Sequence, residues 1–155
     1  METRQLNNNA EQLAELTYKF LSNCHEKEER MAQSHNLTVA ELKCIRHINK
    51  TENVNNKEIA ERMNLSSSRL TRIIDGLVNK GFIEREIDSA DRRNMKLSLS
   101  AEGIKLLERI NLTYLTVHKD ILANIEPKLH TDVIKAMASL LEALEEWLKK
   151  TIDNC

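Results

Sequence analysis

A run of hydroxyl and guanidinium side chains occupies the middle of the sequence. Its polar members are Ser66, Ser67, Ser68, Arg69, Thr71 and Arg72. Serine and threonine hydroxyls near a helix N-terminus can bond phosphate oxygens or base edges, and arginine can donate two parallel hydrogen bonds to the major-groove edge of guanine. Scattered polar residues often form only a solvated helix face, so the segment indicates nucleic acid only with support from its neighbours.

A second segment of the same chemistry follows, Asp88-Ser-Ala-Asp91-Arg92-Arg93. Arginine at the tip of a narrow hairpin can enter a minor groove, where the negative potential of DNA is concentrated. The carboxylates beside it would repel DNA unless they pair internally, so we expect one of Arg92 and Arg93 to reach DNA and the other to brace the hairpin. The competing interpretation is a sheet edge that charge keeps soluble.

Overall charge gives no help in choosing between these interpretations. The formal net charge of the chain is −1, so it lacks the globally basic composition that marks many nucleic-acid-binding proteins. The placement of cations therefore matters more than their sum. Lys57 and Lys80, which flank the polar run, are expected to contact phosphates.

Capping signals and helical periodicity predict the elements that hold the polar run. Thr38–Glu41 has the S/T-x-x-E form of a capping box, and Asn55–Glu58 can cap a helix in the same way. Ser66 or Ser67 can cap the helix that carries the run, and Gly81 stands where a glycine typically ends a helix. Two short helices joined by a brief turn form a helix-turn-helix.

The periodicity changes from helical to alternating after Gly81. A period of two predicts a strand at Ile83–Ile87, where Ile83, Arg85 and Ile87 alternate with glutamates. The alternation of apolar and polar residues predicts a second strand at Met95–Leu99, beyond the charged segment. A hairpin that directly follows a helix-turn-helix is a wing.

Long amphipathic helices are predicted on both sides of the winged helix, with Asn36 and Pro127 as breaks. A small winged helix cannot cover both apolar stripes, so we expect an intertwined homodimer with Trp147 as an anchor. The predicted fold class is mainly α (α+β). The predicted organisation is one domain over 1–155, with a winged-helix lobe at 37–100 and dimerisation helices at 1–36 and 101–155.

The winged-helix segment resembles the MarR family of bacterial transcription regulators. The matching motifs are Leu37-Thr38, Asn56–Ser66, Arg69–Arg85, Asp91-Arg92-Arg93 and Leu99–Gly103. The resemblance implies a homodimer that binds a pseudo-palindromic DNA site, usually as a repressor released by a small molecule or an oxidant. It also implies that the helix from Ser66 to Lys80 enters the major groove, and that Arg93 pairs with Asp75 or Asp91.

Sensing residues are less defined. Some members of the family that the chain resembles sense oxidants through a cysteine in the first helix, where Cys24 lies, but its spacing also fits a buried structural thiol. Cys44 is expected to be partly exposed. Residues that could border a ligand cleft, or equally be core or surface, are Tyr18, His47, Tyr114 and His118. No two histidines stand four residues apart, so no metal site is expected.

Several function classes lack their signals. The sequence has no glycine-rich phosphate loop and no nucleophile motif, so we expect neither an enzyme nor a cofactor. It has no apolar run long enough for a membrane and no C-x-x-C pair, which favours a cytoplasmic protein with reduced thiols. The favoured interpretation is a sequence-specific regulator that binds double-stranded DNA. The alternatives are a cysteine-based redox-sensing regulator and a winged helix that binds only proteins.

Overall fold

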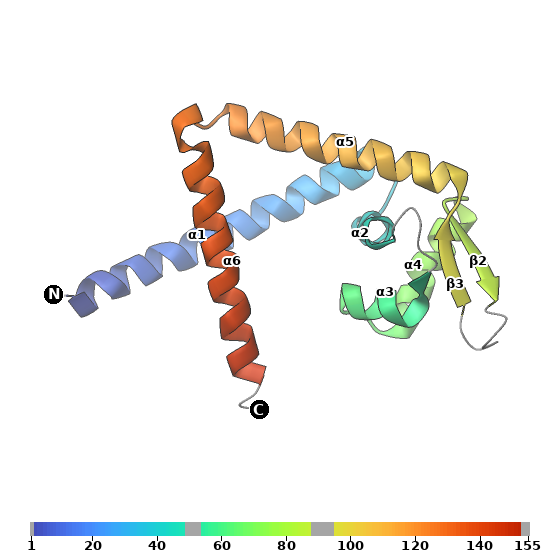
Figure 1. Ribbon diagram of the computed structural model, residues 1–155, viewed down its shortest axis with the longest axis horizontal. Helices are drawn as coiled ribbons and strands as arrows, with labels where there is room; N and C mark the ends of the chain where they lie inside the picture. Colours follow the sequence, from blue (N-terminus) through green and yellow to red (C-terminus); the bar gives the residue numbers. More distant parts are fainter. Residues whose placement is uncertain (1, 49–53, 88–94, 153–155) are drawn as a thin grey trace. The chain divides into compact units, whose positions relative to one another are not determined.

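The computed structural model of the protein describes residues 2–48, 54–87 and 95–152. The elements, in chain order, are α1 (Glu2–Ser34), α2 (Val39–His47), β1 (Val54–Asn55), α3 (Asn56–Met63), α4 (Ser67–Asn79), β2 (Ile83–Ile87), β3 (Met95–Leu99), α5 (Ala101–Ala123), the 3₁₀ helix η1 (Pro127–Leu129) and α6 (His130–Ile152). The chain forms two compact units, Met1–Asn111 and Leu112–Cys155, so their boundary falls within α5. In the first unit α2, α3 and α4 gather beside the β2–β3 hairpin (Figure 1).

The predicted capping boxes are confirmed. At the start of α2, Thr38 Oγ1 accepts a hydrogen bond from the Glu41 amide at 3.2 Å, and Glu41 Oε2 accepts one from the Thr38 amide at 2.8 Å. Asn55 and Glu58 make the same reciprocal pair at the start of α3. Each box satisfies two amide groups that the first helical turn leaves without partners. Local sequence alone therefore determines where these two helices begin.

The ends of α4 also follow local signals. Ser66 is the N-cap residue, and its Oγ accepts a hydrogen bond from the Arg69 amide at 3.4 Å. Beyond the C-terminus, Gly81 has a φ of 76°, a left-handed conformation that costs glycine little. The Gly81 amide donates to the Val78 carbonyl at 2.9 Å, which turns the chain from the helix into β2.

The sheet has three antiparallel strands in the order β1-β3-β2. The predicted strands Ile83–Ile87 and Met95–Leu99 are confirmed, and Ile83 pairs with Leu99 while Arg85 pairs with Leu97. The strand β1 was not predicted; in it, Val54 pairs with Leu97, and both side chains are buried. The charged segment between β2 and β3 lies outside the described residues.

The core of the first unit joins the helix-turn-helix, the sheet and the start of α5. Its largest fully buried side chains include Leu42, Ile45, Ile48, Ile59, Leu70, Ile74, Leu77, Leu97, Leu106 and Ile110. Gly103 brings α5 against the α4–β2 connection, since a Cβ atom on it would lie 2.0 Å from the Phe82 carbonyl oxygen. Ser100 caps α5, because its Oγ accepts from the Gly103 amide at 3.0 Å and donates to the Gly81 carbonyl at 2.6 Å.

The second unit contains the remainder of α5, η1 and α6. The prediction that Pro127 ends the helix before it was wrong, because α5 already ends at Ala123 and Pro127 begins η1. His130 Nε2 lies 2.9 Å from the Leu122 carbonyl oxygen and 3.0 Å from that of Ile125, so the histidine joins α6 to the end of α5. The end of α5 is therefore bonded by a side chain of the next helix, and the sequence around Ala123 does not reveal this contact.

Candidate nucleic-acid interface

The exposed side of α4 carries the side chains that the sequence predicted to contact DNA. The side chains of Leu70, Ile74 and Leu77 are buried in the core. The predicted contact residues Ser66, Ser67, Ser68, Arg69, Thr71 and Arg72 are all exposed. The helical repeat therefore separates an apolar stripe from a surface of hydroxyl and guanidinium groups, as the sequence predicted.

Hydrogen bonds within α4 partly occupy the hydroxyl groups but leave the arginines available. Ser66 and Ser68 join their Oγ atoms at 3.3 Å, and Thr71 Oγ1 donates to the Ser67 carbonyl at 2.9 Å. Arg69 and Arg72 are three residues apart, so they project from one side of the helix. Within the described ranges, neither guanidinium group has a hydrogen-bond or ion-pair partner.

An ion pair ties α4 to the wing. Arg85 Nη2, from β2, donates to Asp75 Oδ1 on α4. The sequence predicted Arg93 as the bracing arginine, paired with Asp75 or Asp91. Asp75 does pair with an arginine of the wing strands, whereas Asp91, Arg92 and Arg93 lie outside the described residues. Arg85 was missed as a bracing residue, although its place at an alternating position of the predicted strand was a usable signal.

The two predicted phosphate contacts have different surroundings. Lys57 lies on α3 with an 84% exposed side chain, and its Nζ is 4.0 Å from Glu61 Oε1. Lys80 Nζ instead donates to Glu41 Oε2 at 2.7 Å and to the Asn36 carbonyl at 3.0 Å. The geometry therefore leaves Lys57 open to an anion, whereas Lys80 is bonded to the α1–α2 turn and to α2.

The cysteines differ in their availability for chemistry. Cys24 on α1 is half-buried, and Cys44 on α2 is buried. Burial and then the nearby Glu41 carboxylate raise the pKa of the Cys44 thiol to about 12. The expectation that Cys44 is partly exposed was wrong, because its side chain is fully buried, as are those of Leu42 and Ile45, so α2 is covered on more than one side. Cys44 is therefore an inert thiol, and Cys24 is the more accessible of the two.

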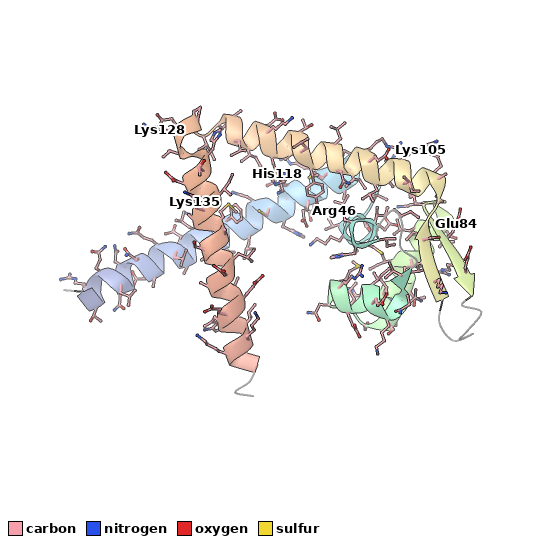
Figure 2. All side chains as sticks on the ribbon, in the orientation of Figure 1. Arg46, Glu84, Lys105, His118, Lys128 and Lys135 are labelled. Atoms are coloured by element: carbon pink, nitrogen blue, oxygen red, sulfur yellow. The ribbon has the colours of Figure 1, made fainter. Side chains whose placement is uncertain are left out.

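The four ligand-cleft candidates belong to two different units. In the first unit, Tyr18 is 78% exposed and His47 is exposed on α2. Desolvation lowers the pKa of His47, and the positive charges of Arg46 (labelled in Figure 2) and Arg62 lower it further. In the second unit, Tyr114 and His118 stack on α5 with ring centroids 6.0 Å apart. The ligand cleft therefore stays a prediction.

The described part of the chain contains neither a candidate metal site nor a candidate membrane-spanning helix. No group of three or more His, Cys, Asp or Glu residues there could hold a metal ion. In the same ranges, none of the helices combines the length and the apolar character that a membrane crossing requires.

Comparisons with known proteins agree on one family. Residues 37–95 match the sequence model of the MarR family. The chain is 34% identical over 68 residues to the HTH-type transcriptional regulator PapX of Escherichia coli, which covers 44% of this chain and 42% of PapX. The match thus spans about half or less of the length of the curated relatives.

Solved structures share the fold over most of the chain. The structure of YusO from Bacillus subtilis is 26% identical and has a TM-score of 0.69, with 86% of this chain and 98% of YusO covered. The MepR–DNA complex of S. aureus is 17% identical with a TM-score of 0.68, and covers 83% of this chain and 97% of that chain. The winged-helix segment, residues 37–95, is thus similar in sequence to the MarR family, and the chain shares its fold with these solved structures.

Proposed function

We propose that this protein is a transcription regulator that binds double-stranded DNA as a homodimer and acts as a repressor until a small molecule releases it. The observation that carries the proposal is the exposed side of α4, where Arg69 and Arg72 project opposite a buried apolar stripe. Arginines on an exposed helix can contact base edges in the major groove, which admits one helix. PapX is named a transcriptional regulator, and MepR was solved with DNA; both support the proposal.

Each part of the winged helix has its own role in this proposal. Arg69 and Arg72 contact bases, while Ser67 and Ser68 bond phosphates near the N-terminus of α4, where the helix dipole favours negative charge. Lys57 contacts a phosphate from α3. Arg92, at the wing, enters the minor groove, and Arg93 limits the wing's conformations by pairing with a carboxylate.

The homodimer is supported by apolar side chains that the single chain leaves exposed on α6. They are Ile134, Met137, Leu140, Leu141, Leu144, Trp147 and Leu148. A helix with so many exposed apolar side chains typically contacts a partner. A second copy of this chain would cover them and would supply the two-fold symmetry that a pseudo-palindromic DNA site requires.

The proposed release by an effector would act on the spacing of the two α4 helices in the dimer. A ligand that binds best to dimers whose two α4 helices are not one DNA turn apart would increase the population of these dimers. It would thereby lower the affinity for the operator. Tyr18, His47, Tyr114 and His118 remain the candidates for contacting it. Such a regulator would act in the cytoplasm, where its DNA lies.

A gel-shift experiment tests the proposal against its alternatives. The purified chain is mixed with DNA from upstream of its own gene and with a shuffled duplex of equal length, with and without peroxide. The proposal expects a shift of the upstream DNA alone, with or without peroxide. A shift that peroxide abolishes in the wild type but not in Cys24→Ser would favour a redox switch. Absence of binding to both duplexes would favour a protein-interaction module, and equal binding to both would contradict sequence-specific recognition.

A further inference from the structure

A buried carboxylate joins three elements of the first unit. Glu41 is 6% exposed, and no other charged residue in the described ranges is buried. Its Oε2 accepts hydrogen bonds from Lys80 Nζ at 2.7 Å and from the Thr38 amide at 2.8 Å. Lys80 Nζ also donates to the Asn36 carbonyl at 3.0 Å. The end of α4, the start of α2 and the turn after α1 therefore meet at one ion pair.

The neighbouring helix surface is shaped for this carboxylate. Gly76 lies in the middle of α4, where glycine is a poor helix former. A Cβ atom on Gly76 would lie 2.7 Å from Glu41 Oε1, which is closer than real Cβ atoms come to other atoms. The absence of a side chain at Gly76 is therefore what lets the Glu41 carboxylate lie against α4.

The electrostatics keep the pair charged. Burial alone would raise the pKa of Glu41, but hydrogen bonds from Lys80 and Thr38 outweigh it and lower that pKa below its ordinary value. The carboxylate is thus ionised near neutral pH. Because one partner is buried, the pair is less screened by solvent than a surface ion pair.

We propose that Glu41 and Lys80 are positioning residues for DNA binding, because their ion pair fixes the C-terminal end of α4 against the turn between α1 and α2. Neither side chain contacts DNA in this role, which rests on the proposed function. The helix α4 has 13 residues and is therefore about 20 Å long. A tilt of about 5° at one end displaces the other by roughly 2 Å, enough to spoil hydrogen bonds from Arg69 and Arg72 to bases.

This role differs measurably from the phosphate contact that the sequence suggested for Lys80. A lost phosphate contact weakens binding to every DNA sequence and reduces the salt dependence by about one phosphate equivalent. A lost positioning contact weakens binding only where bases are recognised, and it leaves the salt dependence unchanged.

The test uses the full-length chain and two probes. One duplex is selected by the wild-type chain from a randomised pool, and the other is a shuffled duplex of equal length. Affinities of Glu41→Gln, Lys80→Met, their double variant and Gly76→Ala are measured by fluorescence anisotropy at several salt concentrations. Lys105→Ala is the control, since Lys105 makes an exposed ion pair with Glu102 on α5; Figure 2 labels Lys105.

The positioning role predicts that each single variant binds the selected duplex about tenfold or more weakly, with unchanged binding to the shuffled duplex. The double variant should bind no more weakly than the worse single variant, because both substitutions remove one interaction. Lys105→Ala should bind as the wild type does. Lys80→Arg retains the charge and should restore most of the affinity that Lys80→Met loses.

Circular dichroism of each variant shows whether it folds. If Lys80→Met does not fold, Glu41→Gln and Lys80→Arg decide the outcome, with amide exchange of residues 67–80 as the measure of α4 order. Folded variants that discriminate the duplexes as well as the wild type overturn the positioning role alone. An equal loss on both duplexes with a smaller salt dependence would make Lys80 a phosphate contact instead. A wild-type chain that binds both duplexes alike overturns the proposed function and this role with it.

Discussion

Arg72 is the residue whose replacement best separates base recognition from phosphate contact. Arg72→Ala should weaken binding to the selected duplex by roughly 1–3 kcal/mol if the guanidinium group bonds a base. Lys57→Ala is the matched control; it should weaken selected and shuffled duplexes alike and reduce the salt dependence by about one phosphate equivalent. Titrations of both variants on both duplexes measure this. Equal losses for Arg72→Ala on the two duplexes would make it a phosphate contact.

The two described cysteines should differ in reactivity. The raised pKa of the Cys44 thiol, about 12, and its burial keep it protonated and inaccessible near neutral pH. Cys24 is half-buried and should react with a maleimide well before Cys44 does. Mass spectrometry of labelled peptides over time checks this order, with urea-unfolded protein as the control in which both react. Labelling of native Cys44 as fast as that of Cys24 would contradict the packing of α2.

Single residues were predictable where their role follows from local pattern. The exposure of Arg69 and Arg72 follows from the cap at Ser66 and the helical repeat. The pair Glu41–Lys80 was not predictable, because it joins residues from different elements. Of the pair Asp75–Arg85, the sequence indicated Asp75 but assigned it to another arginine. Lys80 looked like a phosphate contact since a single sequence shows its charge but not the carboxylate beside it.

Among the elements, the contact between α5 and the α4–β2 connection depends on Gly103. Gly103→Ala would place a Cβ atom 2.0 Å from the Phe82 carbonyl oxygen, so backbone must move. Overpacking of this kind costs typically about 1–3 kcal/mol of the free energy of unfolding. Urea unfolding measures the loss, and Lys105→Ala on the exposed side of the same helix should change stability by less than about 1 kcal/mol. A Gly103→Ala chain as stable as the wild type would show that α5 can shift freely there.

The capping box of α2 should make stability depend on pH. The folded-state pKa of Glu41 is lowered, since bonds from Lys80 and Thr38 outweigh its burial. The unfolded chain therefore binds the proton more readily, and the stabilisation is complete above the ordinary glutamate pKa of about 4.3. It is lost as the pH falls through the folded-state pKa.

Urea unfolding of the wild type and Glu41→Gln over a range of pH checks this dependence. The wild type should be more stable near neutral pH, and the difference should shrink as the pH falls below about 4. Glu102→Gln is the control, because Glu102 also has a lowered pKa, from its hydrogen bond with Lys105, but is fully exposed. A difference that stays constant down to acid pH would mean that the Glu41 charge does not stabilise the fold.

Elements with strong local signals were predicted from the sequence, and those that depend on tertiary pairing were not. Two capping boxes and an alternating pattern were sufficient for α2, α3 and the β2–β3 hairpin. The strand β1 has only two residues and exists because Val54 pairs with Leu97 on a distant strand. The end of α5 at Ala123 was missed because Pro127, the expected terminator, begins the next element instead.

At the scale of the whole molecule, the proposed activity requires two copies of the chain. One winged helix presents one α4 helix, and sequence-specific recognition of a pseudo-palindrome requires two, about one turn of DNA apart. The exposed apolar side chains of α6, among them Leu144 and Trp147, support a second copy as the partner. The central claim is therefore a dimer whose two α4 helices bind two half-sites together.

The most direct test of this claim changes the DNA and leaves the protein intact. The selected duplex is compared with one in which about five base pairs, half a helical turn, are inserted between the half-sites. Anisotropy measures affinity, and sedimentation gives the number of chains per duplex. The account predicts two chains on the selected duplex, half-site centres about 10 base pairs apart, and loss of specific binding upon insertion. A single bound chain, or an affinity that the insertion leaves unchanged, would contradict it.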